Sequence, residues 1–459
     1  MAPPHPSVPG KFLSFLPHHV LPPGGSPAIV DEASMNPGFL TSTGVNRDAT
    51  LQAIVERRVL SDPDLKKLRF ALVDLTGSTN FASPKFAGNR ETEQGGLGSM
   101  AKLACMYTAY QLQHDLKVLS LTKSGLTTAK PLFDAARDIW NDTQKPDKTK
   151  KQVLFPSDPK IELLGKLIEI DGSRVPIPRP FSSPDLEEMF TVSAGVFGAD
   201  VNFKGSDLIL VDPSAHSGAP DISPDAKTYA DTFEHGNLEA VRKLTFAERM
   251  FLMIDDSDNP GAHTCIENVS FLYMVSALWQ SSIYSPQRGG GMWEGTSHDG
   301  AVQWHKPPVP RHNPRADFVS GTAASCATLL TLLEQNRLVS KNACAGMKQL
   351  TSKKKALGGR GSLTRSYFLE GLRSVHVPLD RIHSKLGIGD FRNDGAIVVR
   401  TVTDPADSTK TKQIRYVATG FDEPDPGTKS LHKLIIEFDN CIQENNGLLS
   451  ASSPGLVPP

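Results

Sequence analysis

Apolar residues recur at helical or strand spacing along much of the chain. Apolar positions three and four residues apart predict helices over residues 50–59, 99–116, 245–254, 262–279, 322–335 and 430–443. The clearest apolar face includes Leu103, Met106 and Tyr107, and its helix follows the glycine-rich loop Gly95–Gly98. Short continuous apolar runs predict strands over residues 68–75, 396–402 and 413–419. The pattern therefore indicates a mixed α and β protein.

Composition shifts along the sequence divide it into segments. Proline, glycine and serine dominate residues 1–46 without a sustained period, which predicts an extended arm. A folded domain is expected from residues 47–117 and 243–447, and the heterogeneous stretch 118–242 is expected to be an insertion or subdomain. A flexible tail is expected over residues 448–459.

Charge and cysteine content argue against several classes of protein. The 49 Lys and Arg residues balance 50 Asp and Glu residues, so the chain has no charge excess that would attract nucleic acid or a membrane surface. The five cysteines have no metal-binding spacing, and we expect free thiols that are mostly in the core. The apolar stretch Phe12–Leu16 is too short for a membrane span or signal-peptide core. This predicts a cytoplasmic protein, or a periplasmic or secreted one if a leader has been removed.

The segment Ser99–Lys102 has the spacing S-x-x-K at the start of the predicted apolar helix. Residues three apart share a helix face, so the serine hydroxyl and the lysine amine can meet. A lysine whose pKa is lowered by burial can take the proton of a serine nucleophile. Other S-x-x-K strings begin at Ser120, Ser157 and Ser352, but only Ser99 follows a glycine loop into an apolar helix. The alternative is a helix-capping serine beside a lysine that extends to solvent.

Two further motifs follow in the chain. Ser257–Asn259 is the only S-D-N string, and its hydroxyl and amide could relay a proton and hold an amine. It could equally be a polar turn that ends a helix. Lys385–Gly387 precedes an apolar run. Its lysine could supply a positive charge to a substrate, and its glycine would let the substrate backbone approach the strand closely. The alternative is an exposed lysine on an edge strand. Lys123–Gly125 fits K-T-G better by letter, but it precedes the S-D-N string and has no strand after it.

These three motifs, in this order, resemble those of class A β-lactamases and their penicillin-binding relatives. The likeness covers about residues 50–115 and 243–445, and it includes Leu244–Glu248, Ser320–Ala323 and the stretch from Lys385 to Asp394. The resemblance implies an antiparallel sheet flanked by helices, with an all-helical subdomain and, in this chain, a large insertion. It also implies a serine hydrolase that acts through an acyl-enzyme.

The resemblance assigns a role to each matching residue. Ser99 would be the nucleophile and Lys102 its base. Ser257 and Asn259 would relay the proton and hold the amine, and Lys385 would be an electrostatic anchor. The oxyanion hole would be formed by the backbone N–H groups of Ser99 and Ile388, and Gly387 would lie against the substrate.

The chain departs from the family pattern at two points. Leu386 replaces the hydroxyl residue that helps to bind a substrate carboxylate, and Arg381 or Arg392 could substitute for it. Glu294 is the candidate base for hydrolysis of the acyl-enzyme, but its glycine-rich surroundings differ from the family's loop, and a surface-loop glutamate is the alternative.

The expected partner is a small-molecule or peptide-like substrate, with no cofactor and no metal. An amide or ester substrate is favoured, and a true β-lactamase, a D,D-peptidase with penicillin-binding activity, or a catalytically silent sensor module are the alternatives. His298, His305 and His312 recur every seven residues, but that spacing in a loop fixes no metal geometry, so solvated or structural histidines are expected. The sequence does not define the oligomeric state.

Overall fold

The structure is a computed structural model. It describes residues 36–122, 124–144, 167–170, 173–176, 184–196, 198–206, 238–285, 288–298, 318–352, 366–389, 391–404, 407–424 and 429–457.

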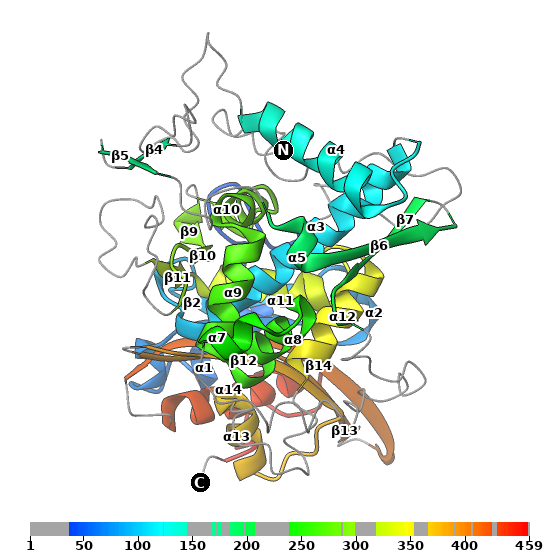
Figure 1. Ribbon diagram of the computed structural model, residues 1–459. Helices are drawn as coiled ribbons and strands as arrows, with labels where there is room; N and C mark the ends of the chain where they lie inside the picture. The colour runs from blue at the N-terminus through cyan, green and yellow to red at the C-terminus, as the bar shows by residue number, and fades with distance from the viewer. Residues whose placement is uncertain are drawn as a thin grey trace.

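A five-stranded antiparallel sheet forms the framework (Figure 1). Its strands, in spatial order, are β12 (Arg381–Ile388), β13 (Phe391–Asp404), β14 (Asp407–Pro424), β1 (Arg69–Asp74) and β2 (Lys85–Asn89). Val73 in β1 lies opposite Val417 of β14 and Phe86 of β2. Strand β1 is buried along its whole length, as its continuous apolar pattern predicts for a central strand.

Alternate residues of the sheet enter two different cores, because successive side chains of a strand point to opposite faces. Phe70 and Leu72 belong to the core shared with the helices α1 (Ala49–Arg58), α13 (Tyr367–Ser374) and α14 (Lys429–Asn445). Ala71 and Val73 belong to the core on the other face, with the helices α3 (Lys102–Thr122) and α11 (Ala323–Glu334). The sheet therefore separates two helical layers.

The helical region beyond the second face is built from α3, α11 and four further helices. These are α8 (Phe246–Phe251), α9 (Asn259–Val269), α10 (Phe271–Gln280) and α12 (Lys341–Thr351), and a π-helix over Leu252–Asp256 links α8 to the turn before α9. The sequence predicted one helix over 262–279, but the chain breaks at Ser270, whose φ is 71°. The Ser270 hydroxyl accepts a hydrogen bond from Tyr273 N, so this serine begins a new helix.

The smaller elements complete the described chain. They are α2 (Gly77–Ala82), α4 (Ala129–Gln144), α5 (Leu186–Met189), α7 (Leu238–Arg242), the 3₁₀ helices Leu65–Lys67 and Gly98–Ala101, the three-stranded sheet of β3 (Gly95–Gly96), β10 (Trp293–Glu294) and β11 (Val319–Gly321), and the hairpins β4–β5 (Leu167–Ile170 and Ser173–Pro176), β6–β7 (Phe190–Gly195 and Gly198–Phe203) and β8–β9 (Tyr284–Ser285 and Gly290–Gly291).

The architecture confirms the predicted fold class, an antiparallel sheet flanked by helices with a helical region beside it. Much of the predicted insertion lies outside the described residues, but its hairpin β6–β7 is anchored on α3. The amide of Gln113 in α3 donates to the carbonyl of Val201, and Ala199 N donates to Ser120 Oγ. Helix α3 itself extends to Thr122, beyond the predicted end at residue 116.

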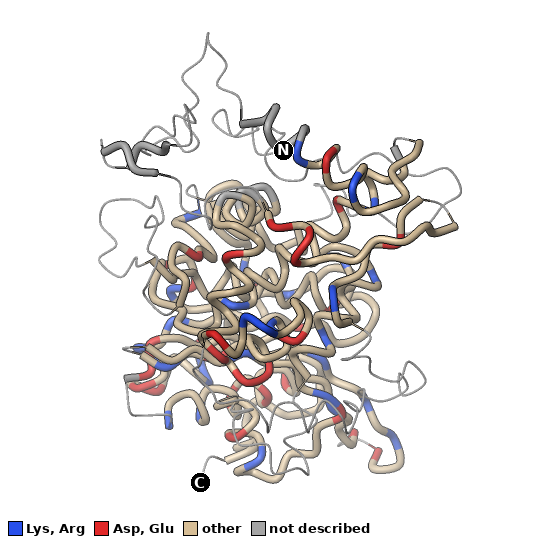
Figure 2. The backbone as a smooth tube through the Cα atoms, in the orientation of Figure 1, with Lys and Arg blue, Asp and Glu red and all other residues tan. Residues whose placement is uncertain are grey.

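All five cysteines are free and buried, which confirms that prediction. Within the described part of the chain, no helix is both long and apolar enough to cross a membrane. Figure 2 shows acidic and basic residues interspersed over the described backbone, consistent with the nearly balanced charge of the sequence.

Candidate active site

Ser99 lies where the glycine loop turns into the buried helix. It is the second residue of the 3₁₀ helix Gly98–Ala101, which continues directly into α3, and its side chain is partly buried. Gly98 adopts a φ of +53°, a left-handed conformation that glycine accepts without strain. The alternative of a capping serine is not what the structure has, because the residue before this 3₁₀ helix is Leu97 and no side chain caps it.

The end of β12 packs tightly against this 3₁₀ helix. A Cβ atom placed on Gly98 would lie 2.4 Å from the carbonyl oxygen of Ile388 and 2.8 Å from its backbone nitrogen. A Cβ atom on Gly387 would lie 1.9 Å from the carbonyl oxygen of Leu97. Two glycines thus allow the backbones to approach, and this places the backbone of Ile388 beside Ser99.

Lys102 is fully buried at the start of α3. Its Nζ donates to the carbonyl oxygen of Ser257 at 2.5 Å and to Asn259 Oδ1 at 2.7 Å, with a longer 3.3 Å contact to the carbonyl of Asp258. The alternative of a lysine that extends to solvent is therefore wrong. Among the described residues, none of the hydrogen bonds of this amine goes to Ser99 Oγ.

Burial lowers the pKa of Lys102 to about 7, while the negative charges of Asp258 and Glu294 act to raise it. A neutral amine has two N–H donors and one lone pair. It can keep the two short hydrogen bonds, to Ser257 O and Asn259 Oδ1, and release the 3.3 Å contact. The lone pair is then available to a neighbouring hydroxyl, and Ser99 is three residues earlier on the same helical segment.

Ser257 projects between the two lysines because of its backbone. It ends the π-helix Leu252–Asp256 in a left-handed conformation, with a φ of 61°. Its carbonyl accepts from Lys102, and its Oγ accepts from Lys385 Nζ at 2.6 Å. The polar-turn interpretation holds for the neighbouring Asp258, which caps α9 by accepting from Gly261 N.

Lys385 lies on the edge strand β12, but its side chain is buried. The alternative of an exposed edge lysine is therefore wrong. Strand alternation directs Lys385 and Gly387 to the side of the 3₁₀ helix, whereas Leu386 points to the opposite face and joins the core under α13 and α14.

Glu294 is fully buried, so the alternative of a surface-loop glutamate is wrong. The glycine-rich stretch contains the short strand β10, which pairs with β11, and β11 pairs with the glycine loop at β3. This small sheet connects Glu294 to the segment that precedes Ser99. Strand β10 contacts α3, and the negative charge of Glu294 acts to raise the pKa of both Lys102 and Cys105 in that helix.

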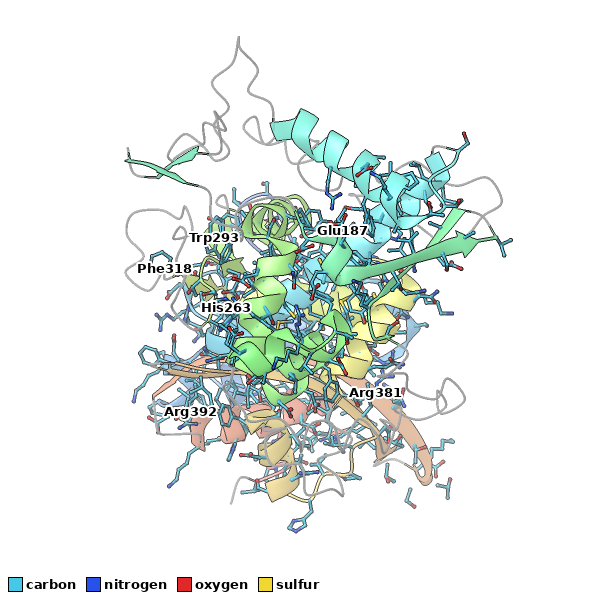
Figure 3. The ribbon with its side chains drawn as sticks, viewed as in Figure 1. Glu187, His263, Trp293, Phe318, Arg381 and Arg392 are labelled. Atoms are coloured by element: carbon cyan, nitrogen blue, oxygen red, sulfur yellow. The ribbon has the colours of Figure 1, made fainter. Side chains whose placement is uncertain are left out.

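The two arginines considered as carboxylate binders have other partners. Arg381 begins β12 and donates to Glu334 Oε1 at 2.5 Å, and Arg415 and Lys348 contact the same buried carboxylate. Arg392 donates to the hydroxyl of Tyr367 at 2.8 Å and lies over its ring. Figure 3 shows Arg381 and Arg392 toward opposite ends of the sheet.

Two residues near the site were not identified as functional from sequence. His298 Nε2 lies 3.1 Å from Glu294 Oε2, and no sequence signal predicts this contact, because the segment is not helical. His305 and His312 lie outside the described residues. Asn393 sits at a β-bulge opposite Gly387, and its amide donates to the carbonyl of Gly96. The bulge that directs this side chain to the glycine loop has no sequence signature.

No cluster of His, Cys, Asp and Glu residues with the arrangement of a metal site is found in the described portion of the chain. The contacts described above join hydroxyl, amine and amide side chains.

Comparison with known proteins gives likenesses to solved structures. No family model matches the chain, and no curated protein matches it. A β-lactamase from Sphaerobacter thermophilus is 13% identical, with 88% of this chain and 98% of that one covered and a TM-score of 0.39. A class A β-lactamase from Bacteroides cellulosilyticus is 12% identical, with coverage of 87% and 99% and a TM-score of 0.41. The protein PBP-A is 12% identical, with coverage of 87% and 98% and a TM-score of 0.40.

Proposed function

We propose that this chain is a serine hydrolase that forms a covalent acyl-enzyme on Ser99. The observation that carries the proposal is Lys102, a buried amine with a pKa of about 7, one helical turn after Ser99. An amine that is half neutral near pH 7 matches the requirement for a general base. A lysine with only a structural role would add no folding stability through this burial, because burying a charged amine is unfavourable.

Acylation uses the contacts around Ser257. Neutral Lys102 takes the proton of Ser99 Oγ as that oxygen attacks the carbonyl carbon of the substrate. The oxyanion of the tetrahedral intermediate is held by the backbone N–H groups of Ser99 and Ile388. The proton then passes through Ser257 Oγ, which Lys385 holds, to the leaving oxygen or nitrogen, and the bond from carbon to the leaving group breaks. Lys102 returns to its neutral form.

Deacylation requires a base for water, and Glu294 is the proposed one. Its carboxylate takes a proton from a water molecule, and the resulting hydroxide attacks the acyl carbon. The bond to Ser99 Oγ breaks, this oxygen takes back the proton that Glu294 holds, and a carboxylic acid leaves. The support is the complete burial of Glu294 in β10, a strand that contacts α3, and the effect of its charge on the pKa of Lys102.

An ester or amide without a carboxylate is the substrate class favoured here. Leu386 has its side chain in the core, so no hydroxyl is present at the position where the related families bind a carboxylate. Arg381 is paired with Glu334. Ile388 and Phe391, at the turn beside Ser99, are 47% and 41% exposed, which provides an apolar rim for an uncharged substrate group.

Activity-based labelling tests the nucleophile. A fluorophosphonate probe and a fluorescent penicillin, followed by mass spectrometry of peptides, should modify Ser99. Ser99→Ala should abolish the adduct, and Ser352→Ala, which alters another S-x-x-K serine, should leave it unchanged. An adduct that persists in Ser99→Ala would reject the proposal, and complete absence of labelling would favour the alternative of a silent binding module.

Steady-state kinetics test the substrate class. Short p-nitrophenyl esters and amides, with and without a carboxylate on the acyl group, are compared with a chromogenic cephalosporin. We expect the uncharged esters to give the larger kcat/KM. Rapid cephalosporin turnover with negligible ester hydrolysis would instead support a true β-lactamase, and preference for a D-alanyl-D-alanine peptide would support a D,D-peptidase.

A further inference from the structure

We propose that Asn393 is a positioning residue for the oxyanion hole. It holds the glycine loop before Ser99 at a fixed height over the end of β12, so that the backbone N–H groups of Ser99 and Ile388 converge on one oxygen. The inference rests on the proposed function, since it deepens the acylation step on Ser99. It assigns a role to a side chain that acts through the backbone of the loop rather than on the substrate.

Asn393 lies on the sheet directly under the glycine loop. It pairs with Gly387 across β12 and β13, so the two residues face the same side of the sheet. On that side, Nδ2 of Asn393 donates to the carbonyl oxygen of Gly96 at 3.0 Å, and a Cβ atom on Gly387 would overlap the carbonyl oxygen of Leu97. Two consecutive peptide groups of the loop thus rest on an opposed pair of sheet residues, and Ser99 follows two residues later.

The hydrogen bonds of the Asn393 amide leave it one orientation. A β-bulge interrupts the ladder between β13 and β14 at this residue, and the backbone N–H of Asp422 donates to Asn393 Oδ1 at 3.1 Å. An N–H group on one side requires the amide oxygen there, so the NH₂ group faces the carbonyl of Gly96 on the other side. Asn393 is 2% exposed, so bulk water does not compete for these bonds.

A buried ion pair fixes the backbone that orients Asn393. The guanidinium of Arg69 donates to both carboxylate oxygens of Asp422 and to the carbonyl oxygen of Glu93. A Cβ atom on Gly95 would overlap that guanidinium, so the start of the loop packs directly on it. Arg69 therefore anchors the first residues of the loop, and Asn393 anchors the next part, which leads to the nucleophile.

The two proposed oxyanion donors belong to the two parts that Asn393 joins. The N–H of Ser99 follows the loop, and the N–H of Ile388 belongs to the residue after Gly387 in β12. Preorganised donors stabilise an oxyanion only if both point to the place where it forms, and a displacement of about 1 Å can cost roughly 100-fold in rate. Loss of the bond to Gly96 should therefore weaken binding of the transition state more than binding of the ester.

Asn393→Asp isolates the contact with Gly96. A carboxylate of the same shape can still accept from Asp422 N, but it cannot donate to a carbonyl. Stopped-flow bursts with p-nitrophenyl acetate on the full chain give the maximal acylation rate and the ester concentration at half of that rate. We expect the maximal rate to fall by roughly 10- to 100-fold, while the half-saturating concentration stays within about twofold.

Phenylboronic acid tests the oxyanion hole itself. Ser99 Oγ bonds to boron and gives its proton to Lys102, and one hydroxyl of the resulting tetrahedral anion occupies the oxyanion hole. Its dissociation constant should rise in Asn393→Asp by the same factor as the acylation rate falls. Asn440→Asp is the matched control, because buried Asn440 in α14 also donates to a carbonyl and accepts from an N–H, both of Leu456. Its acylation rate and boronate affinity should equal those of the unaltered protein.

Each outcome decides the inference. A slower burst and weaker boronate binding in Asn393→Asp, with the control unaffected, support it. An unaltered burst rate overturns it and leaves the serine hydrolase proposal intact, and so does a slower burst with unaltered boronate affinity, because the loss then lies outside the oxyanion hole. Equal losses in Asn440→Asp also overturn it. If Asn393→Asp does not fold, an unaltered burst rate in the uncharged variant Asn393→Ala overturns the inference. Absence of any burst in the unaltered protein overturns both proposals.

Discussion

The pKa of Lys102 predicts how acylation depends on pH. Because burial lowers this pKa to about 7, about half of the amine is neutral at pH 7. An exposed lysine with a pKa near 10.5 would be neutral in roughly one molecule in 3,000 at that pH. Burial thus increases the concentration of the active base by roughly 10³-fold. The acylation rate should rise tenfold per pH unit below about pH 6 and level off above about pH 8.

Removing a negative charge next to Lys102 should move this curve. Glu294 and Asp258 both raise the pKa of the amine, so their neutral amide variants should lower it further. Glu294→Gln and Asp258→Asn are therefore expected to shift the rising part of the acylation curve to lower pH. Asparagine is as good a helix cap as aspartate, so the second variant keeps the start of α9 intact.

The assay is the burst phase with p-nitrophenyl acetate, recorded by stopped flow from pH 5 to pH 9. Glu56→Gln, an exposed change on α1, serves as the control and should reproduce the unaltered curve. Lys102→Met should lower the rate by roughly 10²- to 10⁴-fold at every pH, the loss expected for a positioned base.

Two results would refute this reasoning. A curve that rises only near pH 10 would mean that Lys102 is not the group that titrates. A shift to higher pH in both Glu294→Gln and Asp258→Asn would contradict the electrostatic account, because loss of a neighbouring negative charge cannot favour the charged amine.

Three further expectations concern the same framework. Gly387→Ala should greatly reduce the burst rate while the protein stays folded by circular dichroism, because a Cβ there would lie 1.9 Å from the carbonyl oxygen of Leu97. Glu334→Gln should lower the free energy of unfolding by about 3 kcal/mol in urea titrations, since its three basic partners lose their shared carboxylate. Between about pH 7 and pH 10.5, Lys102 is protonated in the unfolded chain but largely neutral in the folded one. The free energy of unfolding should therefore rise with pH over this range. Lys102→Met should lack this rise.

Much of the fold could be predicted because it depends on local periodicity. The predicted helix over 322–335 and strand over 68–75 agree with α11 and β1 to within about two residues. Such elements bury a regular apolar face or run, and the sequence displays that regularity directly. Strand β2 and helices α12 and α13 were not predicted, because their short segments mix polar and apolar residues.

The candidate site was only partly accessible to sequence reasoning. The motif order identified Ser99, Lys102, Ser257 and Lys385, and the last three are joined by hydrogen bonds in the structure. The burial of Glu294 could not be predicted, since it depends on two-residue strands paired over long separations. Strands of that length have no detectable period, so the glycine-rich stretch resembled a surface loop.

The last prediction concerns Leu386, where sequence and structure suggest different outcomes. By sequence, Leu386→Thr restores the K-T-G motif and should improve the hydrolysis of substrates that carry a carboxylate. In the structure this side chain is 6% exposed and lies in the core on the face opposite Gly387, so a threonine hydroxyl there would be buried away from the site.

We expect a loss of about 1–3 kcal/mol in the free energy of unfolding from the smaller side chain and the buried hydroxyl. The ratio of kcat/KM between carboxylated and uncharged esters should not change. Urea titration and paired ester kinetics measure the two quantities, with Leu386→Val as the control for lost volume. An increase of tenfold or more in that ratio for Leu386→Thr alone would show that residue 386 can reach the substrate.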